Sequence, residues 1–449
     1  MESSTKKTLS YGLDFGTTNS TISVSLDGKI NVLPINFKSK DPYMFQSAMY
    51  FKTGQIKFAS EAIQDYLQDL SQANLAINKF ATSDKQIEIF QGSTKVSVNQ
   101  TIEYQECNIG RIMRSFKSLL GNNVNYITKI GHKSMSYEDI LAVFFREIKK
   151  RADNIVGQNV EKVVIGRPVK FVKDDSSGIN PILHLTNAMK LAGFKEIEFQ
   201  YEPVGAAFGY GSETKEKIFV FDFGGGTLDT SIVNLANNKI LSSYGAPIGG
   251  DLMDQSLYDY YIAKFLGKNL RYGQRQLSFS PLAVSQMISW FDVIEYRTRK
   301  FFDYLDSVRY RANEPETIEF IRFFLKSNLA FPLRKSIVEA KEQLSNKDQF
   351  NFVFETSIKT IKETFEKSTF EKSIESYLEE ATRVIKNTFK IAGINLTDID
   401  KVIMTGGSSL IPKFRFFIEE MFGKDKVILY EPFTAVSKGL AVISKNIFK

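Results

Sequence analysis

The chain has 449 residues, of which 43% are hydrophobic and 24% are charged. This length suffices for about three domains or for one large two-lobed fold, and the composition is that of a globular protein with a sizeable core. The net charge is +7, from 58 Lys and Arg against 51 Asp and Glu, but basic and acidic residues are interleaved. Since no run of like charge marks a nucleic-acid-binding surface, we expect no nucleic-acid partner.

Cysteine, histidine and hydropathy exclude further classes. The single Cys107 rules out an internal disulfide framework and a thiolate metal cluster. His132 and His184 lie far apart in the sequence, and we interpret both as structural. No apolar run approaches the roughly 20 residues of a membrane helix. The polar N-terminus leads directly into a strand without a signal-peptide core, so we expect a cytoplasmic protein that does not associate with membranes.

Two segments far apart in the chain share one pattern. Residues 12–24 and 220–233 each predict an apolar strand that ends in Asp-Phe-Gly, followed by small or hydroxyl residues and an alternating strand. A second turn-and-strand signal follows each of them, at 26–29 and at 235–239. The repetition predicts two similar lobes within one chain.

Strands and helices alternate between the two hairpins. Residues 136–139 resemble a capping box and open an amphipathic helix that runs to about Val156. Residues 162–166 predict a short buried strand. A helix near 181–192 stops at Gly193, which predicts a left-handed cap.

The chain after the second hairpin is more helical. An acidic-basic helical region is expected around 358–391, residues 401–404 form one last core strand, and Pro412 lies near the start of another helix. The three helical stretches before this region are expected at 281–312, 315–328 and 331–346.

A carboxylate at the tip of a strand, followed by glycine and hydroxyl residues, suits phosphate and Mg²⁺ together. Glycines let backbone amides approach phosphate oxygens closely. Asp14 and Asp222 cannot contact a phosphate favourably without a cation between them, which implies Mg²⁺ with part of its water shell. One such hairpin is often only a structural turn. Two of them, a lobe apart, favour a nucleotide held between the lobes.

The two hairpins resemble the phosphate motifs of the actin-like ATPase superfamily, specifically of the DnaK-type, seventy-kilodalton heat-shock chaperones. The long helical stretch before residue 340 and the Gly-Arg-Pro form are most similar to the short, chaperone-like YegD-type proteins. The resemblance implies an α/β, two-lobed actin-like ATPase fold, each lobe a mixed β-sheet with helices, and ATP or ADP with Mg²⁺ in the cleft between the lobes. Further segments that match in order are 116–121, 165–168, 201–211, 248–254, 340–345 and 405–412.

The resemblance also implies how the chain is divided. Residues 8–212 and a C-terminal helix at 432–449 would form lobe I. Residues 213–431 would form lobe II, with a helical stretch at about 268–334. The full chaperones continue through a linker into a β-rich peptide-binding domain, which we do not expect here. We expect a monomer.

Individual roles follow from the matched motifs. Asp14, Asp222 and Asp229 would hold Mg²⁺, mostly through water. Lys117 would stabilise charge at the γ-phosphate and place the attacking water, whereas the residue types alone would make it a solvated helix lysine. Glu202 would orient the metal and the hinge, and Asp222 and Thr227 would complete the catalytic set. The residues implied in nucleotide binding are Gly16, Thr17, Thr18, Gly224, Gly225, Gly226, Thr227, Gly249, Gly250, Asp251, Lys341, Ser345, Gly406, Gly407 and Ser408.

The nucleoside side departs from the family pattern. Val338 stands where the family has a glutamate, Leu410 where many members have an arginine, and Phe433 where an acidic residue is expected. An arginine stacked on the base contributes about 1 kcal/mol. We therefore expect weaker adenine affinity and leave base specificity open.

The segment 290–304 is more aromatic and longer than the corresponding chaperone segment. Aromatic residues that alternate with basic ones can mark a protein-partner surface. At helical spacing, however, they more often form a buried stripe. Both interpretations stay open.

Three functions compete. The motif set favours an ATPase with a chaperone-related role. A small-molecule kinase on the same fold would need a catalytic carboxylate where Lys117 stands. An actin-like filament or nucleotide-sensing scaffold is the third alternative, and light scattering with ATP would separate a filament from a monomer.

Overall fold

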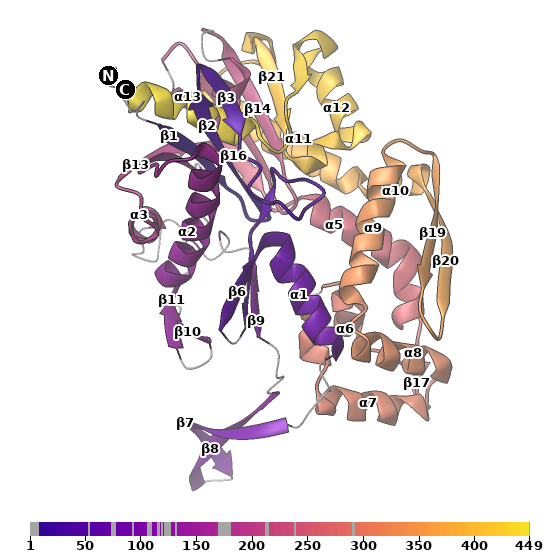
Figure 1. Cartoon of the computed structure of the whole chain (residues 1–449). Coiled ribbons are helices and arrows are strands. Elements are labelled where there is room, and N and C mark those ends of the chain that lie inside the picture. The colour runs from indigo at the N-terminus through magenta and orange to yellow at the C-terminus, as the bar shows by residue number, and fades with distance from the viewer. Residues whose placement is uncertain are drawn as a thin grey trace.

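A computed structural model describes residues 9–52, 54–72, 78–91, 94–105, 110–114, 117, 120, 127–130, 133–168, 181–211, 215–237, 239–289 and 292–448. Cys107, His132, Trp290 and most of the segment 116–121 lie outside these residues. Within them, no helix combines the length and apolar character needed to cross a bilayer. The molecule is a mixed α/β structure built around two principal sheets (Figure 1).

The two sheets have the same topology. In each, the first strand of the Asp-Phe-Gly hairpin pairs antiparallel with the second strand and parallel with a strand that follows much later. This confirms the predicted two-lobed fold. The first sheet has the order β13 (Glu196–Tyr201), β12 (Lys162–Arg167), β1 (Ser10–Phe15), β2 (Asn19–Leu26) and β3 (Lys29–Val32), and β4 (Phe45–Gln46) also pairs with β2. The second consists of β22 (Val427–Leu429), β21 (Lys401–Thr405), β14 (Lys217–Phe223), β15 (Leu228–Asn234) and β16 (Lys239–Ala246).

Local sequence signals determine where two helices of the first lobe begin or end. The side chain of Ser136 accepts from the amide of Asp139, and the reciprocal bond completes a capping box at the start of α2 (Tyr137–Val156). This helix ends at Gly157, where φ is 77°. α3 (Pro181–Ala192) ends before Gly193 with φ of 106°. Both predicted helices are therefore confirmed.

A close helix crossing connects the two sheets. α4 (Glu202–Tyr210) packs on β14, β15 and β21 of the second sheet and on β12 and β13 of the first, and α13 (Ala435–Ile447) packs on β1, β2 and β12. The two helices also pack extensively against each other. A Cβ on Gly439 would overlap the carbonyl oxygen of Gly205, and a Cβ on Gly209 would overlap that of Ala435. Only glycine permits this approach of the two backbones.

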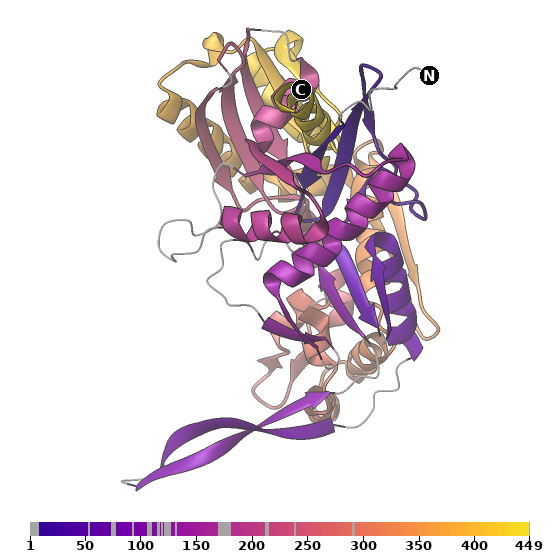
Figure 2. The ribbon, with the colours of Figure 1, turned by 60° about the vertical axis from the view of Figure 1, so that its left-hand side comes forward.

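A smaller sheet extends the first lobe. It has the order β6 (Gln55–Phe58), β5 (Ala48–Lys52) and β9 (Arg111–Arg114), and α1 (Ala59–Gln72) packs on it. Strands β7 (Asn78–Gln91) and β8 (Thr94–Gln105) pair as a separate two-stranded hairpin. Figure 2 shows this hairpin projecting from the body of the molecule.

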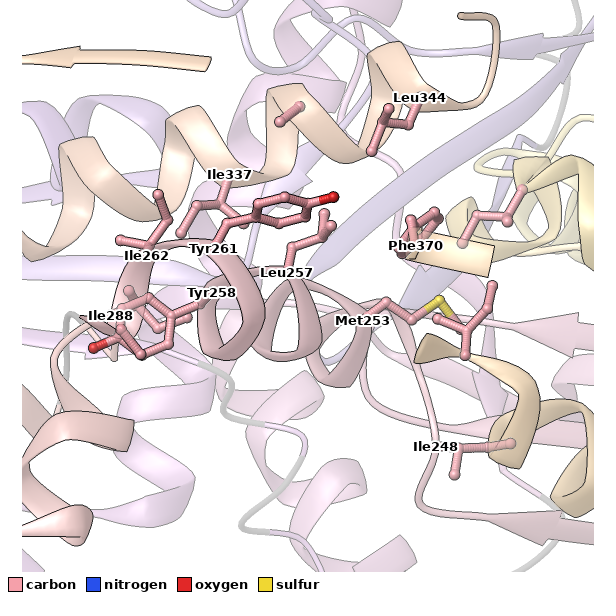
Figure 3. Packing of buried hydrophobic residues seen from close by; sticks show 14 of the residues in the cluster. Ile248, Met253, Leu257, Tyr258, Tyr261, Ile262, Ile288, Ile337, Leu344 and Phe370 are labelled. Carbon is pink, nitrogen blue, oxygen red and sulfur yellow. The ribbon is translucent and has the colours of Figure 1, made fainter. Parts of the chain in front are cut away.

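The helical part of lobe II is built on α5 (Gly250–Leu257) and α9 (Ala330–Leu344). Apolar side chains of both helices interlock, among them Leu257 and Ile337 (Figure 3). α8 (Pro315–Lys326) and α9 confirm two of the three predicted helical stretches. β17 (Arg271–Tyr272) and β18 (Leu277–Ser278) pair within the stretch that was expected to be helical.

The predicted helical stretch at 281–312 is divided into three helical segments, namely α6 (Pro281–Gln286), a 3₁₀ turn and α7 (Arg299–Arg309). The hydroxyl of Ser289 accepts a hydrogen bond from the backbone amide of Asp292, and that of Thr298 accepts one from the amide of Phe301. Each hydroxyl caps the start of a new helical segment.

The region 358–391 was expected to be helical, but it begins with a strand. β20 (Thr360–Glu366) pairs with β19 (Gln349–Glu355) before α10 (Lys367–Ser373) and α11 (Glu375–Ala392) follow. Ile361 and Phe365 lie on one face of β20 and are buried. The Phe365 ring stacks on Tyr261 with centroids 4.3 Å apart. Tertiary packing of these residues overrides the helix propensity of the charged ones between them.

We predict that Gly439→Ala lowers the free energy of unfolding by about 2 kcal/mol, because the new methyl group must push α13 away from α4. Helix propensity alone would change stability in the opposite direction. Urea denaturation measures the difference. Asn446→Ala, on the exposed side of α13, is the control and should change stability by less than about 0.5 kcal/mol. A stabilised Gly439→Ala protein would contradict the close crossing.

Candidate functional site

The turns that follow β1 and β14 face each other where the two lobes meet. The first comprises residues 16–18 and the second residues 224–227. A Cβ on Gly225 would lie 3.7 Å from the hydroxyl oxygen of Thr18 and 3.7 Å from a carboxylate oxygen of Asp251. The structure therefore brings both sequence-predicted turns together with the start of α5.

Hydrogen bonds from residues outside the hairpins hold each turn in place. The backbone amide of Ser47 donates to the carbonyl oxygen of Thr18 at 2.9 Å, and its hydroxyl donates to that of Gly16 at 2.8 Å. In the second lobe, the hydroxyl of Ser408 donates to the carbonyl oxygen of Gly224 at 2.7 Å. Sequence reasoning did not find Ser47, because it belongs to no motif.

The glycines of the second turn are not required by the conformation of the chain. Neither Gly225 nor Gly226 has a positive φ, and a Cβ on Gly226 would have no neighbour within 4 Å. Among the described hydrogen bonds, none uses the amide of Gly225 or Gly226. Such a turn offers backbone donors and room for an anion to approach them closely.

Four carboxylates surround one ammonium group beside these turns. Asp14 and Asp222 occupy equivalent positions near the ends of β1 and β14, and Asp229 lies opposite Asp222 in β15. Glu202 begins α4. The ammonium of Lys117 donates to a carboxylate oxygen of Glu202 at 2.5 Å.

Two glycines that the sequence interpretation did not include make room for this cluster. A Cβ on Gly245 would overlap a carboxylate oxygen of Asp229. A Cβ on Gly166 would lie 3.1 Å from Cγ of Glu202, which is closer than ordinary van der Waals contact. Gly166 lies within a matched motif, whereas no local signal marks Gly245.

Burial and mutual repulsion perturb the carboxylates. Burial first, and then Glu202, raise the pKa of Asp14 to about 7, against the opposing effect of Lys117. Burial, Asp229, Glu202 and Asp14 raise the pKa of Asp222 to about 8. Asp229 is exposed by its accessible surface. The protein atoms packed around its carboxylate nevertheless reduce the hydration of the charged form, and this raises the pKa of Asp229 as well. Burial alone would lower the pKa of Lys117, but the carboxylates, led by Glu202, raise it. The cluster carries more negative charge than one lysine can balance.

The start of α5 is tied to the second turn. The amide of Gly250 donates to the carbonyl oxygen of Gly224 at 3.2 Å, and the amide of Asp251 donates to that of Gly225 at 2.8 Å. A Cβ on Gly249 would overlap the carbonyl group of Gly225. In this arrangement the amides of Gly250 and Asp251 bond to the protein and hold the turn in place.

A buried ion pair links α9 to α5. The ammonium of Lys341 lies 2.5 Å from the carboxylate of Asp254 and 3.3 Å from the carbonyl oxygen of Gly250. Burial raises the pKa of Asp254, and Lys341 opposes that shift. The hydroxyl of Ser345 donates to the carbonyl oxygen of Lys341 within the helix. Asp254 was missed as a site residue although it lies in a matched motif.

The expected nucleoside side gathers around the turn after β21. Gly406 has a φ of 82°, and a Cβ on Gly407 would lie 2.9 Å from the ring of Phe433. The side chains of Phe433 and Leu410 are 41% and 44% exposed, and Val338 is half-buried on α9. The weaker adenine affinity expected from these apolar side chains stays a prediction, and base specificity stays open.

The described aromatic residues of the segment 290–304 pack inward. Phe301, Phe302 and Tyr304 are partly buried against the lobe II core. The rings of Phe301 and Tyr296 contact each other with centroids 4.9 Å apart. This packing favours the buried stripe for these residues, and a partner surface on this segment stays an untested proposal.

A comparison with protein-family models agrees with this geometry. The model described as Hsp70 protein matches residues 10–276 and 308–447. The chain belongs to the Hsp70 family. The matched stretches contain both turns, the acidic cluster and α9, whereas residues 277–307, with α6 and most of α7, fall between them. A special similarity of this Hsp70-family chain to the YegD-type proteins stays a prediction.

We predict that Lys341→Met lowers the free energy of unfolding by about 3 kcal/mol, because it leaves the buried Asp254 without its ion-pair partner. Adding Asp254→Leu should recover a large part of that loss. Thermal and urea denaturation of both variants measure this. The control is Arg415→Met, which breaks a more exposed pair with Glu419 and should cost less than about 1 kcal/mol. Equal losses for both single variants would contradict the buried role of Lys341.

Proposed function

We propose that this Hsp70-family protein binds ATP with Mg²⁺ at the two facing turns and hydrolyses it to ADP and phosphate. The observation that carries the proposal is the placement of four carboxylates and one lysine directly beside two turns that offer backbone donors. Carboxylates alone would repel a polyphosphate. Together with donors and a lysine, they suit a phosphate chain that arrives with a divalent cation.

The phosphates would lie against the turns. The amides of Gly225 and Gly226 make none of the described hydrogen bonds, and the hydroxyls of Thr17 and Thr18 are on exposed residues opposite them. The hydroxyl of Thr227 acts to lower the pKa of Asp229 and would orient that carboxylate. Donors held by both lobes would fix the phosphate chain between them.

The cation would be held by Asp14, Asp222 and Asp229. Their surplus negative charge, seen in the raised pKa values of Asp14 and Asp222, fits a divalent ion. Among the described residues, no group of three carboxylates, imidazoles or thiols is arranged to ligate a metal directly. The carboxylates would therefore act largely through water bound to the ion. Mg²⁺ would supply charge neutralisation of the phosphates.

Lys117 would stabilise the charge that develops on the transferred phosphoryl group and orient the attacking water. Its ion pair with Glu202 holds the ammonium in place before substrate binds. Glu202 is the first residue of α4, which packs on strands of the second lobe. The lysine is therefore positioned through the element that joins the two lobes, and phosphoryl transfer depends mainly on such positioning.

We further propose a chaperone-related role, which the family membership supports. Leu410 and Phe433 would contact the base by apolar packing in place of the charged groups of the family pattern. Affinity would then depend mainly on the phosphates and the cation.

Isothermal titration calorimetry with ATP, with and without Mg²⁺, tests the function. The parent protein should bind ATP more tightly with Mg²⁺. Asp222→Asn should lose most of this Mg²⁺-dependent gain, because it removes a carboxylate from the cation's surroundings. Asp303→Asn, on the exposed face of α7, is the control and should keep it. Absence of ATP binding by the parent protein would overturn the proposed function.

Lys117→Ala should lower the single-turnover rate of ATP hydrolysis by about a hundredfold, since it removes a preorganised charge. ATP affinity should change by less than about tenfold. Lys57→Ala, in the neighbouring small sheet, serves as the control with unchanged rate. Equal rates for Lys117→Ala and the parent protein would remove this lysine from the mechanism.

A further inference from the structure

The turn after β21 contacts the turn 224–227 and also an aromatic ring. Gly407 begins a 3₁₀ turn, and a Cβ on it would lie 2.9 Å from the ring of Phe433. The next residue, Ser408, donates from its hydroxyl to the carbonyl oxygen of Gly224 at 2.7 Å. Consecutive Cα atoms are about 3.8 Å apart. The ring therefore lies close to the turn at which the phosphates are proposed to bind.

Two helices of lobe II reach the same place. A Cβ on Gly250 of α5 would be 2.8 Å from the hydroxyl oxygen of Ser408 and 3.2 Å from the ammonium of Lys341 on α9. The turn 224–227 also borders the acidic cluster, whose buried carboxylates do not suit an uncharged base. The neighbourhood of Ser408, with the ring of Phe433, suits such a base better.

The backbone is strained just before this ring. Glu431 has a φ of 34°, in the left-handed region that residues other than glycine rarely adopt. Its carboxylate pairs with the ammonium of Lys438 and accepts from the hydroxyl of Thr434 at 2.6 Å. The carbonyl oxygen of Pro432 accepts from the amide of Gly406 at 2.9 Å. Strained backbone of this kind persists where many contacts determine it, and it is concentrated at binding sites. These bonds fix the position of the ring that follows.

The fixed ring is nevertheless open to solvent. The side chain of Phe433 is 41% exposed, and that of Leu410, on the same turn as Gly407, is 44% exposed. A ring left in water returns little hydrophobic free energy to offset the strain that holds it. A flat ligand stacked on the ring would remove this surface from water.

Polar side chains near the ring bond within the protein. The hydroxyl of Ser409 donates to the carbonyl oxygen of Thr405 at 2.5 Å, and the hydroxyl of Thr405 donates to that of Pro432 at 3.3 Å. Bases differ in the hydrogen-bonding groups on their edges, but each has a face that can stack. An apolar contact rejects a ligand that differs only in its polar groups much less than a hydrogen-bonding contact does.

We propose that Phe433 is the stacking platform for the base of the bound nucleotide and that the site accepts guanine as well as adenine. The substrates would then be purine nucleoside triphosphates as a class. This inference rests on the proposed function, because the phosphates and Mg²⁺ would be held as described above. It adds the residue that holds the base and the range of bases that the site takes.

Calorimetry of the full chain in the presence of Mg²⁺ compares ATP with GTP. The parent protein should bind them with affinities within about threefold of each other, since stacking distinguishes bases little. Phe433→Ala should weaken both about 5- to 100-fold, the usual effect of removing a ring that stacks on a base. Phe433→Trp keeps an aromatic face and should bind both at least as tightly as the parent.

The matched control is Phe416→Ala. Phe416 is also an exposed aromatic residue of lobe II, on α12 (Pro412–Phe422). This variant should bind both nucleotides like the parent protein. Thermal unfolding of each variant verifies the fold.

The outcomes separate this inference from the proposed function. If the parent protein binds neither ATP nor GTP, the proposed function fails. If it binds ATP but binds GTP more than about tenfold more weakly, ATP binding stands and the acceptance of guanine is overturned. Parent-like binding by Phe433→Ala, or the same loss in Phe416→Ala, would overturn the assignment of Phe433. Weakening of ATP alone by Phe433→Ala would also contradict a platform common to both bases.

Discussion

The imbalance of charge where the two lobes meet is the constraint on which the site depends. Asp14, Asp222, Asp229 and Glu202 converge on a single ammonium group, that of Lys117. Bringing like charges together in a partly buried place costs free energy. The fold supports this arrangement with rigid strands below it and with glycines that make space for the carboxylates, and a bound cation would relieve it.

The crossing of α4 and α13 couples the positions of the two lobes. Because Gly205 and Gly439 lack side chains, the two helices approach within backbone contact and share an apolar cluster with strands of both sheets. Glu202 stands at the start of α4, so the residue that holds Lys117 is fixed by this inter-lobe packing. A shift of one lobe relative to the other would therefore move Glu202 and change the geometry of the acidic cluster.

α9 has a similar organising role on the opposite side. This helix packs through Phe331 on the apolar cluster formed by the small sheet and α1, holds Asp251 through Arg334 and anchors the buried Asp254 through Lys341. Residues 277–307 fall between the stretches matched by the family model, yet their described aromatic side chains belong to the lobe II core or pack against it, and this core also contains apolar side chains of α9. These residues enlarge the lobe that positions α9.

Elements with local signals could be predicted from the sequence, whereas elements that depend on distant partners became apparent only in the structure. The capping box of α2, the glycine after α3 and the repeated Asp-Phe-Gly hairpin are local, so they predicted two helices, two equivalent turns and a two-lobed fold. By contrast, β20 forms because Ile361 and Phe365 find buried partners far along the chain. Ser47 and Gly245 reach the site from segments without a recognisable pattern of their own. Their positions were decided by tertiary packing, because burial, close backbone approach and charge interaction depend on distance in space and leave no periodic trace in the sequence.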